Sequence, residues 1–258
     1  MNILKYEKQL TLYQLDFKMS NKFTRILLAL QGTIKSYQKK LLPNFSMPKL
    51  ELTEADFVKL LLSEDFLDGY TYSEKEEYLD EFAEFLENFR IYIQDKFGVW
   101  AMINQPMMDT WVQSLPGKSY LELMAGNGSL SKALEDRHQS VISTDSFAWS
   151  NESSTGRELW TKVEKLDALA AIQKYGESVD VILLAWSPDY DRIDVDILNA
   201  IRNLKNHPMF LLIGEYKGAT NSQLFWHEAK LHYDKRIALI NRMYPNFDLV
   251  KDHLFSIR

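Results

Sequence analysis

The chain has 258 residues, a formal net charge of −6, 46% hydrophobic and 13% aromatic residues, and no cysteine. This composition is typical of a folded globular protein rather than a disordered one. The lack of cysteine excludes disulfides, thiolate metal sites and cysteine nucleophiles, and the acidic balance argues against a large duplex nucleic-acid interface. The apolar runs 26–30, 181–186 and 209–213 are too short to span a bilayer, and residues 1–8 mix charged with apolar side chains. We therefore expect a soluble, cytoplasmic protein.

The charges are unevenly distributed in the first part of the chain. Residues 1–42 carry eight basic and two acidic residues, a net charge of +6, whereas residues 51–96 carry four basic and fourteen acidic residues, a net charge of −10. One interpretation is that the two segments complement each other within one helical unit. The alternative is a basic arm for an acidic partner.

The same region shows helical patterns throughout. Apolar residues recur every three or four positions from Ile3 to Phe17 and from Phe23 to Leu41. Two capping boxes follow, Thr53 with Asp56 opening a helix to about residue 66, and Ser73 with Glu76 opening a long helix through residue 93. These patterns predict an all-helical domain over residues 1–97.

A strand, a glycine turn and a helix are predicted over residues 119–134. The apolar run from Tyr120 to Leu123 is typical of a buried parallel strand, with Glu122 in it, and Gly126 and Gly128 let a ligand approach the turn closely. Ser129 or Ser131 could cap the helix that follows. A dinucleotide site would place a third glycine where this chain has Ser131.

This stretch resembles motif I of the class I S-adenosylmethionine-dependent methyltransferases, E/D-x-G-x-G-x-G. The chain reads Glu122-Leu123-Met124-Ala125-Gly126-Asn127-Gly128 and departs from the motif at Met124. The resemblance implies that S-adenosylmethionine is bound by Glu122, Met124, Ala125, Gly126, Asn127 and Gly128. A carboxylate near the turn suits a sulfonium and an amino group, whereas an NAD-linked oxidoreductase would leave Glu122 unexplained.

The segment before the first strand, residues 98–111, is rich in tryptophan and methionine. In the family this segment often folds over the cofactor, so Trp100 or Trp111 could lie against the sulfonium. The alternative is that these residues join the helical part to the α/β part.

Further strands alternate with helices, as in a parallel sheet. The strand 140–145 ends in Asp145, which matches the family's ribose-binding acid, although NAD proteins place an acid similarly. Residues 147–161 are predicted as a mobile loop. A strand near residues 162–166 precedes Asp167 and Ala168, which resemble the adenine-binding motif III; Asp167 is equally well explained as a helix N-cap.

The fourth strand, residues 179–186, ends at Trp186 and is followed by Ser187-Pro188-Asp189-Tyr190. This sequence partly matches motif IV of amino-group methyltransferases that act on nucleic acids. The fifth strand, residues 209–213, leads to Glu215, which we expect to face the cleft because burying it unpaired would be costly.

The end of the chain predicts a helix capped by Asn221 and a closing antiparallel hairpin of residues 246–251 and 253–257. His227 and His232 are one residue too far apart for the zinc pattern H-E-x-x-H, so we expect no metal site.

Together, the sequence predicts an α/β fold over residues 98–258: a mostly parallel, Rossmann-like class I methyltransferase sheet with a closing hairpin. The helical domain would cap the cleft or pair two subunits as a homodimer. The resemblance implies S-adenosylmethionine-dependent transfer of a methyl group to a small-molecule or protein acceptor, with Asp189 and Glu215 orienting or deprotonating it and Tyr190 forming a wall. Trp186 is expected at the cofactor. The alternatives are a nucleic-acid amino methyltransferase, an NAD-linked oxidoreductase and a catalytically silent interaction module.

Overall fold

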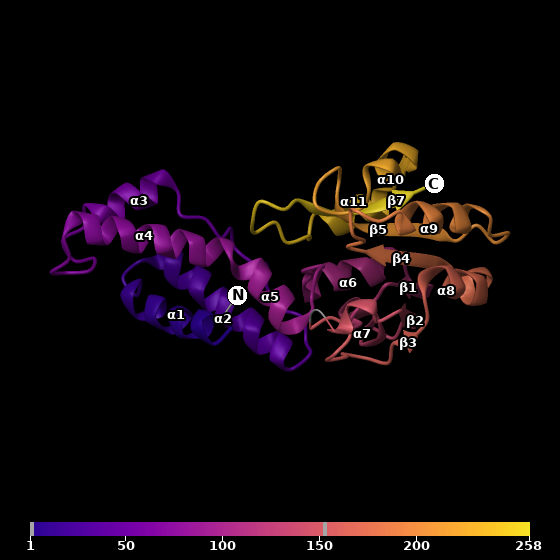
Figure 1. Cartoon of the computed structure of the whole chain (residues 1–258), viewed down its shortest axis with the longest axis horizontal. Helices are drawn as coiled ribbons and strands as arrows, with labels where there is room; N and C mark the ends of the chain where they lie inside the picture. Colours follow the sequence, from indigo (N-terminus) through magenta and orange to yellow (C-terminus); the bar gives the residue numbers. More distant parts are fainter. Residues whose placement is uncertain (1–2, 152–153) are drawn as a thin grey trace.

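The computed structural model describes residues 3–151 and 154–258. The helices of residues 3–97 form one end of the molecule and a sheet flanked by helices forms the other (Figure 1). These helices are α1 (Ile3–Asp16), α2 (Asn21–Gln38), α3 (Glu54–Leu61), α4 (Tyr72–Glu87) and α5 (Phe89–Phe97). None of the helices in the described ranges combines the length and apolarity that crossing a membrane requires.

The second part alternates helices with strands. The strands are β1 (Ser119–Leu123), β2 (Ser140–Asp145), β3 (Glu164–Lys165), β4 (Val181–Ala185), β5 (Met209–Glu215), β6 (Leu231–His232) and β7 (Asp252–Ile257). The helices are α6 (Gln105–Ser114), α7 (Ser129–Glu135), α8 (Ala168–Tyr175), α9 (Ile193–Arg202), α10 (Gln223–Glu228) and α11 (Lys235–Asn241), with short 3₁₀ turns at Ala148–Asn151 and Gly176–Ser178.

The strands form one sheet in the order β3-β2-β1-β4-β5-β7-β6. Strands β1 to β5 are parallel, and β7 is inserted antiparallel between β5 and β6. This order confirms the prediction of a mostly parallel Rossmann-like sheet closed by an antiparallel pair, with a helical region before it.

Successive side chains of the strands point to opposite faces of the sheet, so two separate hydrophobic cores form. Tyr120, Val181 and Leu211 pack on the face covered by α6, α7 and α11, whereas Leu121 and Ile182 pack under α8, α9 and α10. Because successive side chains of a strand point to opposite faces, Glu122 of β1 lies on the same side as Tyr120, toward α7.

The helical part and the sheet share the first of these cores, which runs without interruption from Tyr6 in α1 to Leu254 in β7. Ring contacts cross the junction: Tyr37 meets Trp160 with centroids 5.4 Å apart, and Phe89 meets Phe247 at 6.4 Å. The division into residues 1–97 and 98–258 stays a prediction.

The predicted starts and ends of the N-terminal helices are partly corrected. Thr53 and Asp56 form the predicted capping box, but α3 ends at Leu61 rather than at residue 66. Helix α4 begins with a box of Thr71 and Glu74, so the predicted Ser73 already lies in its first turn. The predicted long helix is interrupted at Asn88, where α4 passes into α5.

The closing hairpin differs from the prediction. Residues 246–251 form no strand; the neighbour of β7 is β6 instead. The reason is tertiary: Phe247 and Asp248 contact α5 of the helical part. Asn221 does not cap α10 either, because its φ of +60° lies outside the extended region of an N-cap, and Ser222 takes that role.

Candidate functional site

A cavity of about 270 Å³ lies at the carboxyl ends of β1, β2 and β4. The carboxyl edge of a parallel sheet is where open α/β folds bind ligands. Nine predicted site residues line this cavity: Trp100, Glu122, Met124, Ala125, Gly126, Asp145, Trp186, Asp189 and Tyr190. The structure therefore brings together residues that are up to 90 positions apart in the chain.

Glu122 is buried at the end of β1 and is held by the first turn of α7. The amide of Ser131 donates to its carboxylate over 2.9 Å, and the hydroxyl of Ser131 donates to the same oxygen. Burial outweighs these bonds and raises the pKa of Glu122 to about 7. Ser131 therefore does not cap α7, whose N-cap is Gly128 with a φ of +73°.

Asp145 organises the glycine turn. One of its oxygens accepts the amide of Gly126 over 2.8 Å, and the other accepts the amide of Phe147 over 2.6 Å. Gly126 itself has a φ of +56°, and a Cβ there would come within 3.1 Å of Thr155. Both the backbone conformation and the tight contact with Thr155 favour a glycine at this point.

Two larger residues of the cavity also adopt left-handed backbone conformations, Met124 with a φ of +54° and Trp186 with a φ of +56°. Such conformations cost about 1–3 kcal/mol each outside glycine. The side chain of Met124 lines the cavity at the position where the resembling motif has a glycine.

Aromatic rings form two walls of the cavity. Trp100 and Trp186 face each other with centroids 6.0 Å apart, and the Trp100 indole donates to the hydroxyl of Thr155 over 2.9 Å. At the mouth, Trp149 and the exposed Tyr190 lie 6.2 Å apart. Trp111, the alternative to Trp100, is instead completely buried beneath the sheet and joins the two parts of the chain.

Behind Trp186 lies a buried ion pair that comes from the helical part. Arg90 of α5 binds Asp248 with two hydrogen bonds of 2.5 and 3.0 Å, and Asp252 with one of 3.1 Å. Its guanidinium also lies over the rings of Trp186 and Phe247, 5.3 and 4.9 Å from their centroids. Helix α5 thus supports one wall of the cavity.

Two predicted residues of the glycine motif point elsewhere. The side-chain NH₂ of Asn127 donates to the carbonyls of Phe97 and Ser154, and its side-chain oxygen accepts the backbone amide of Gly156. Asn127 therefore ties the turn to α5 and to the segment after β2. Gly128 packs against Thr161 and lies outside the cavity lining as well.

Asp167 and Ala168 also lie outside the residues that line the cavity. Asp167 is the N-cap of α8 and accepts the backbone amide of Ala170 over 2.9 Å. The sequence leaves open whether Asp167 is such a cap or an adenine-binding residue. Part of the predicted mobile loop, residues 152 and 153, falls outside the described residues.

Glu215 does not face the cavity, in contrast to the expectation. Its two oxygens accept the backbone amides of Ala219, in the loop after β5, and of Lys251, directly before β7, at 2.9 and 3.0 Å. The expectation considered only burial without a partner, and these two segments provide backbone partners that no sequence pattern shows.

Several lining residues were not among the predicted site residues, among them Trp149, Thr155 and Ala219. Ser187 also lines the cavity, and the sequence indicated it only as the first residue of the partial motif IV after the fourth strand. It is 1% exposed, and its hydroxyl has no hydrogen-bond partner among the described residues. A buried hydroxyl of this kind is suited to a ligand.

The charge of the side chains that line the cavity distinguishes between cationic and anionic candidate ligands. It includes three carboxylates, Glu122, Asp145 and Asp189, and no Lys, Arg or His among the described residues. The amides of Gly126 and Ser131 are already bonded to carboxylates. The acidic lining favours a positively charged compound over an anion such as a pyrophosphate. Within the described ranges, no three acidic or histidine side chains come together as a metal site.

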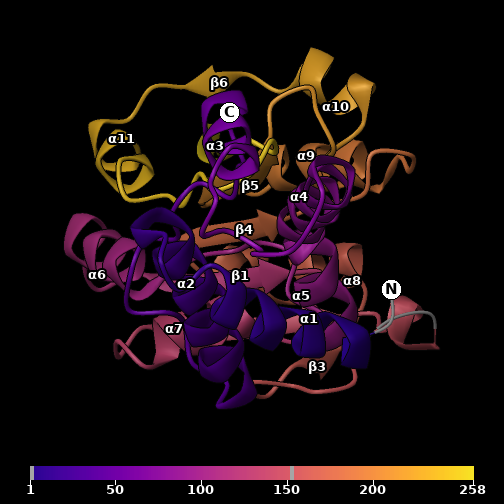
Figure 2. The same cartoon turned by 90° about the vertical axis from the view of Figure 1, so that its left-hand side faces the viewer.

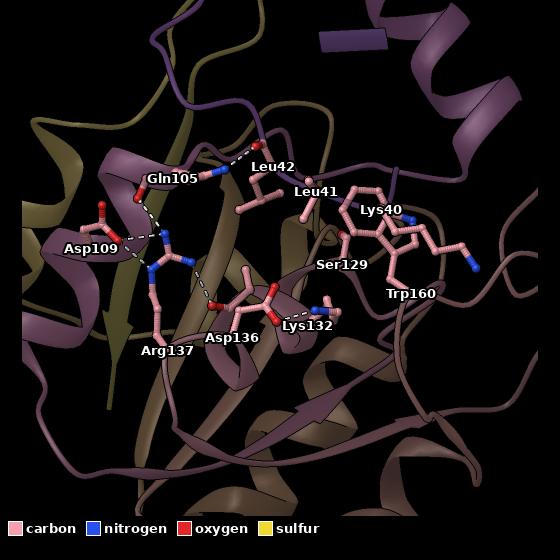
Figure 3. Close-up of a pocket in the computed structure, with 11 residues that line it drawn as sticks. Lys40, Leu41, Leu42, Gln105, Asp109, Ser129, Lys132, Asp136, Arg137 and Trp160 are labelled. Atoms are coloured by element: carbon pink, nitrogen blue, oxygen red, sulfur yellow. Dashed lines mark hydrogen bonds and ion pairs between the residues drawn. The ribbon is translucent and has the colours of Figure 1, made fainter. Parts of the chain in front are cut away.

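A second cavity of about 300 Å³ lies on the other side of α7, between it, the loop after α2 and the start of α6 (Figure 3). Its charges are already paired: Arg137 binds Asp109 and the carbonyl of Gln105, and Lys132 binds Asp136. Lys40 donates to the carbonyl of Leu159. We assign no ligand to it.

No protein-family model matches the sequence, and no curated protein matches it. Solved structures of similar fold include a putative O-methyltransferase from Nostoc punctiforme, with 10% identity, a TM-score of 0.39, and coverage of 96% of this chain and 98% of that one. Human N-acetylserotonin methyltransferase in complex with S-adenosylmethionine has 12% identity, a TM-score of 0.38, and coverage of 91% and 69%. TehB from Haemophilus influenzae has 16% identity and a TM-score of 0.35, and the match spans 65% of each chain.

The fold assignment depends on the sheet itself rather than on these distant likenesses. A mostly parallel sheet, an antiparallel pair at its edge and a cavity at the carboxyl ends of the strands are the features that the sequence resemblance implied; the structure adds the strand order 3-2-1-4-5 with an antiparallel β7 next to β5. The chain therefore has the fold of the class I S-adenosylmethionine-dependent methyltransferases.

Proposed function

We propose that this protein transfers a methyl group from S-adenosylmethionine to a small-molecule or protein acceptor. The observation that supports this most directly is the lining of the cavity, which combines three carboxylates with neighbouring aromatic rings and contains no basic side chain among the described residues. Such a lining favours a positively charged compound with a planar base.

The residues of the chain would divide the binding between them. Each oxygen of Asp145 accepts one backbone amide and keeps a second lone pair for a ribose hydroxyl. Gly126 lets the ligand approach the turn, and the rings of Trp100 and Trp186 would lie against its positive charge, an attraction of about 1–2 kcal/mol when desolvated. Bound S-adenosylmethionine supplies an electrophilic methyl group on its sulfur.

The acceptor would enter at the mouth, where Asp189 and Tyr190 are exposed. Asp189 is placed to orient an amine or hydroxyl, or to take up its proton, and the ring of Tyr190 would form a wall beside it. Catalysis of this transfer is largely the alignment of two reactants, so the proposal invokes no catalytic group beyond these residues. The net charge of −6 and the carboxylates that line the cavity favour a small or cationic acceptor over duplex DNA.

Calorimetry with S-adenosylmethionine, S-adenosylhomocysteine and NAD tests the cofactor. We expect binding of the first two and none of NAD. Asp145→Ala should weaken the binding at least tenfold, because it removes the ribose acceptor and releases the turn. Asp167→Ala is the matched control: it removes a helix cap outside the cavity and should leave the affinity within twofold. Binding of NAD alone would support the oxidoreductase alternative, and no binding at all would support a silent interaction module.

Transfer of labelled methyl groups tests the acceptor. With mixed amines, proteins, RNA and DNA as acceptors, we expect label in small molecules or protein and its loss in Asp189→Ala. Label in RNA or DNA that depends on Asp189 would instead support the nucleic-acid alternative, which rests on Ser187–Tyr190 and the basic residues 1–42.

A further inference from the structure

Helix α1 carries apolar side chains on two opposite faces. Tyr6, Leu10 and Tyr13 are buried in the helical core. The other face exposes a second apolar stripe, whose spacings of eight, three and four residues keep it on one side of the helix. Its side chains are Leu4 (73% exposed), Leu12 (58%), Leu15 (62%) and, in the turn after α1, Met19 (83%). An exposed apolar stripe of this kind is suited to a further contact.

Basic side chains lie within and beside the exposed stripe. Lys8 lies one helical turn from both Leu4 and Leu12, and Lys18 lies at the end of the stripe. Lys8, Lys18 and Arg25 of α2 are exposed and have no ion-pair partner among the described residues. We call the stripe and its lysines the basic–apolar face; its members are Leu4, Lys8, Leu12, Leu15, Lys18 and Met19.

Acidic side chains do not belong to this face. The acidic residues of α1 are engaged within the chain, since Glu7 binds Lys96 and Asp16 accepts the hydroxyl of Tyr78. Residues 17–50 contain seven basic residues and no acidic one. Helix α2, which a side-chain hydrogen bond joins to α1, therefore adds only positive charge beside the face.

The acidic side of α4 points away from the basic–apolar face. Tyr13 of α1 packs on Phe82 of α4 with ring centroids 4.8 Å apart, and both rings are buried. The exposed sides of the two helices therefore face opposite ways. In Figure 1, α1 and α2 lie below and α3 and α4 above, at the end of the molecule away from the sheet, and this end faces the viewer in Figure 2. An anionic surface can thus meet α1 without approaching the acids of α4.

The composition of the basic–apolar face favours a lipid surface as its partner. Protein interfaces are enriched in aromatic residues and arginine and depleted of lysine, whereas this face has lysines and no aromatic residue. Face-to-face pairing of two copies would also bring Lys8 and Lys18 against positive charge. A nucleic-acid backbone would attract the lysines but would leave the leucines uncovered. In a membrane interface, the apolar side chains enter the acyl boundary while the lysine stems extend to the headgroups.

We propose that α1 binds the surface of a membrane that contains anionic phospholipids, through its basic–apolar face. The helix would lie in the plane of the interface, with its leucines inserted and with Lys8, Lys18 and Arg25 at the lipid headgroups. The net charge of −6 on the whole chain does not oppose this contact, because charges beyond a Debye length of about 8 Å are largely screened.

Co-sedimentation with vesicles tests the apolar part. Wild type should bind vesicles of phosphatidylcholine mixed with phosphatidylserine at least about tenfold more tightly than vesicles of phosphatidylcholine alone. Leu12→Gln/Leu15→Gln leaves the charge unchanged and should weaken this binding at least about tenfold, because less apolar area is then inserted. Leu62→Gln/Leu249→Gln, at positions 62% and 87% exposed outside the face, is the matched control and should bind like wild type. Circular dichroism and thermal denaturation show whether each variant is folded.

Charge reversal tests the electrostatic part. Lys8→Glu/Lys18→Glu should weaken binding to the mixed vesicles at least about tenfold, and added salt should weaken the binding of wild type. Lys205→Glu/Lys235→Glu changes the net charge by the same amount at exposed positions outside the face, so its affinity should stay within about twofold of wild type.

Three results would overturn this assignment of the face. Wild type would bind neither kind of vesicle, or it would bind both kinds equally. The third result is a wild type that dimerises in sedimentation equilibrium while Leu12→Gln/Leu15→Gln stays monomeric, because a second copy of the chain would then cover the face.

Discussion

At the scale of single residues, Glu122 shows how position in a fold sets chemistry. The sequence places a carboxylate on a strand, and burial beneath α7 raises its pKa to about 7 from an ordinary value of 4.5. The folded protein therefore binds a proton at Glu122 that the unfolded chain has already released above pH 4.5. Met124 is a second example, since it adopts a left-handed backbone conformation that usually favours glycine, and its side chain lines the cavity.

This proton predicts a pH dependence of stability. The free energy of unfolding should fall as the pH rises from about 4.5 to about 7, by up to about 3 kcal/mol, and then level off. Glu122→Gln has no such titration, so its stability should vary less over this range and exceed that of wild type near pH 8. Urea denaturation of both proteins between pH 4.5 and 8 measures this; parallel curves would contradict the buried, protonated state.

At the scale of elements, α5 is the link between the helical part and the cavity. Arg90 forms ion pairs with Asp248, which precedes β7, and with Asp252, the first residue of β7. Its guanidinium also lies over the ring of Trp186. Burial raises the pKa of Asp252 to about 6, while Arg90 opposes that rise. The position of one cavity wall thus depends on a helix that ends before the α/β part begins.

Arg90→Met should therefore affect both stability and ligand binding. Leaving two buried carboxylates without their partner costs about 3–5 kcal/mol. The wall formed by Trp186 should also loosen, so the affinity for S-adenosylhomocysteine should fall severalfold at temperatures where the variant is still folded. Calorimetry at 10 °C, with thermal denaturation alongside, separates the two effects. Arg137→Met breaks an ion pair outside the cavity and is the control; equal losses of affinity in both variants would contradict the link.

At the scale of the whole molecule, the helical part and the sheet share one continuous core. Removing residues 1–97 would expose the apolar side chains on this side of the sheet, Phe247 among them, and would leave Asp248 and Asp252 without Arg90. A cap that folds independently would instead have its own closed core.

We therefore expect the full chain to unfold in a single cooperative transition, and residues 98–258 alone to be aggregated or loosely packed. Scanning calorimetry of the full chain and dye binding by the fragment measure this. Two separate transitions, or a fragment with sharp NMR signals, would show that the division at residue 97 marks two autonomous domains.

Local pattern in the sequence determined the five parallel strands, their alternation with helices, and the acids at their carboxyl ends, because periodicity and glycine placement act over a few residues. Glu122, Gly126 and Asp145 could be predicted for this reason. The tertiary structure alone decided which of these side chains reach the cavity. The side chains of Glu215 and Asn127 form hydrogen bonds with backbone groups of other segments. Arg90 binds Asp248, 158 positions away, and residues 246–251 contact α5 instead of joining the sheet. Such contacts depend on the three-dimensional course of distant segments, which leaves no pattern within any one of them.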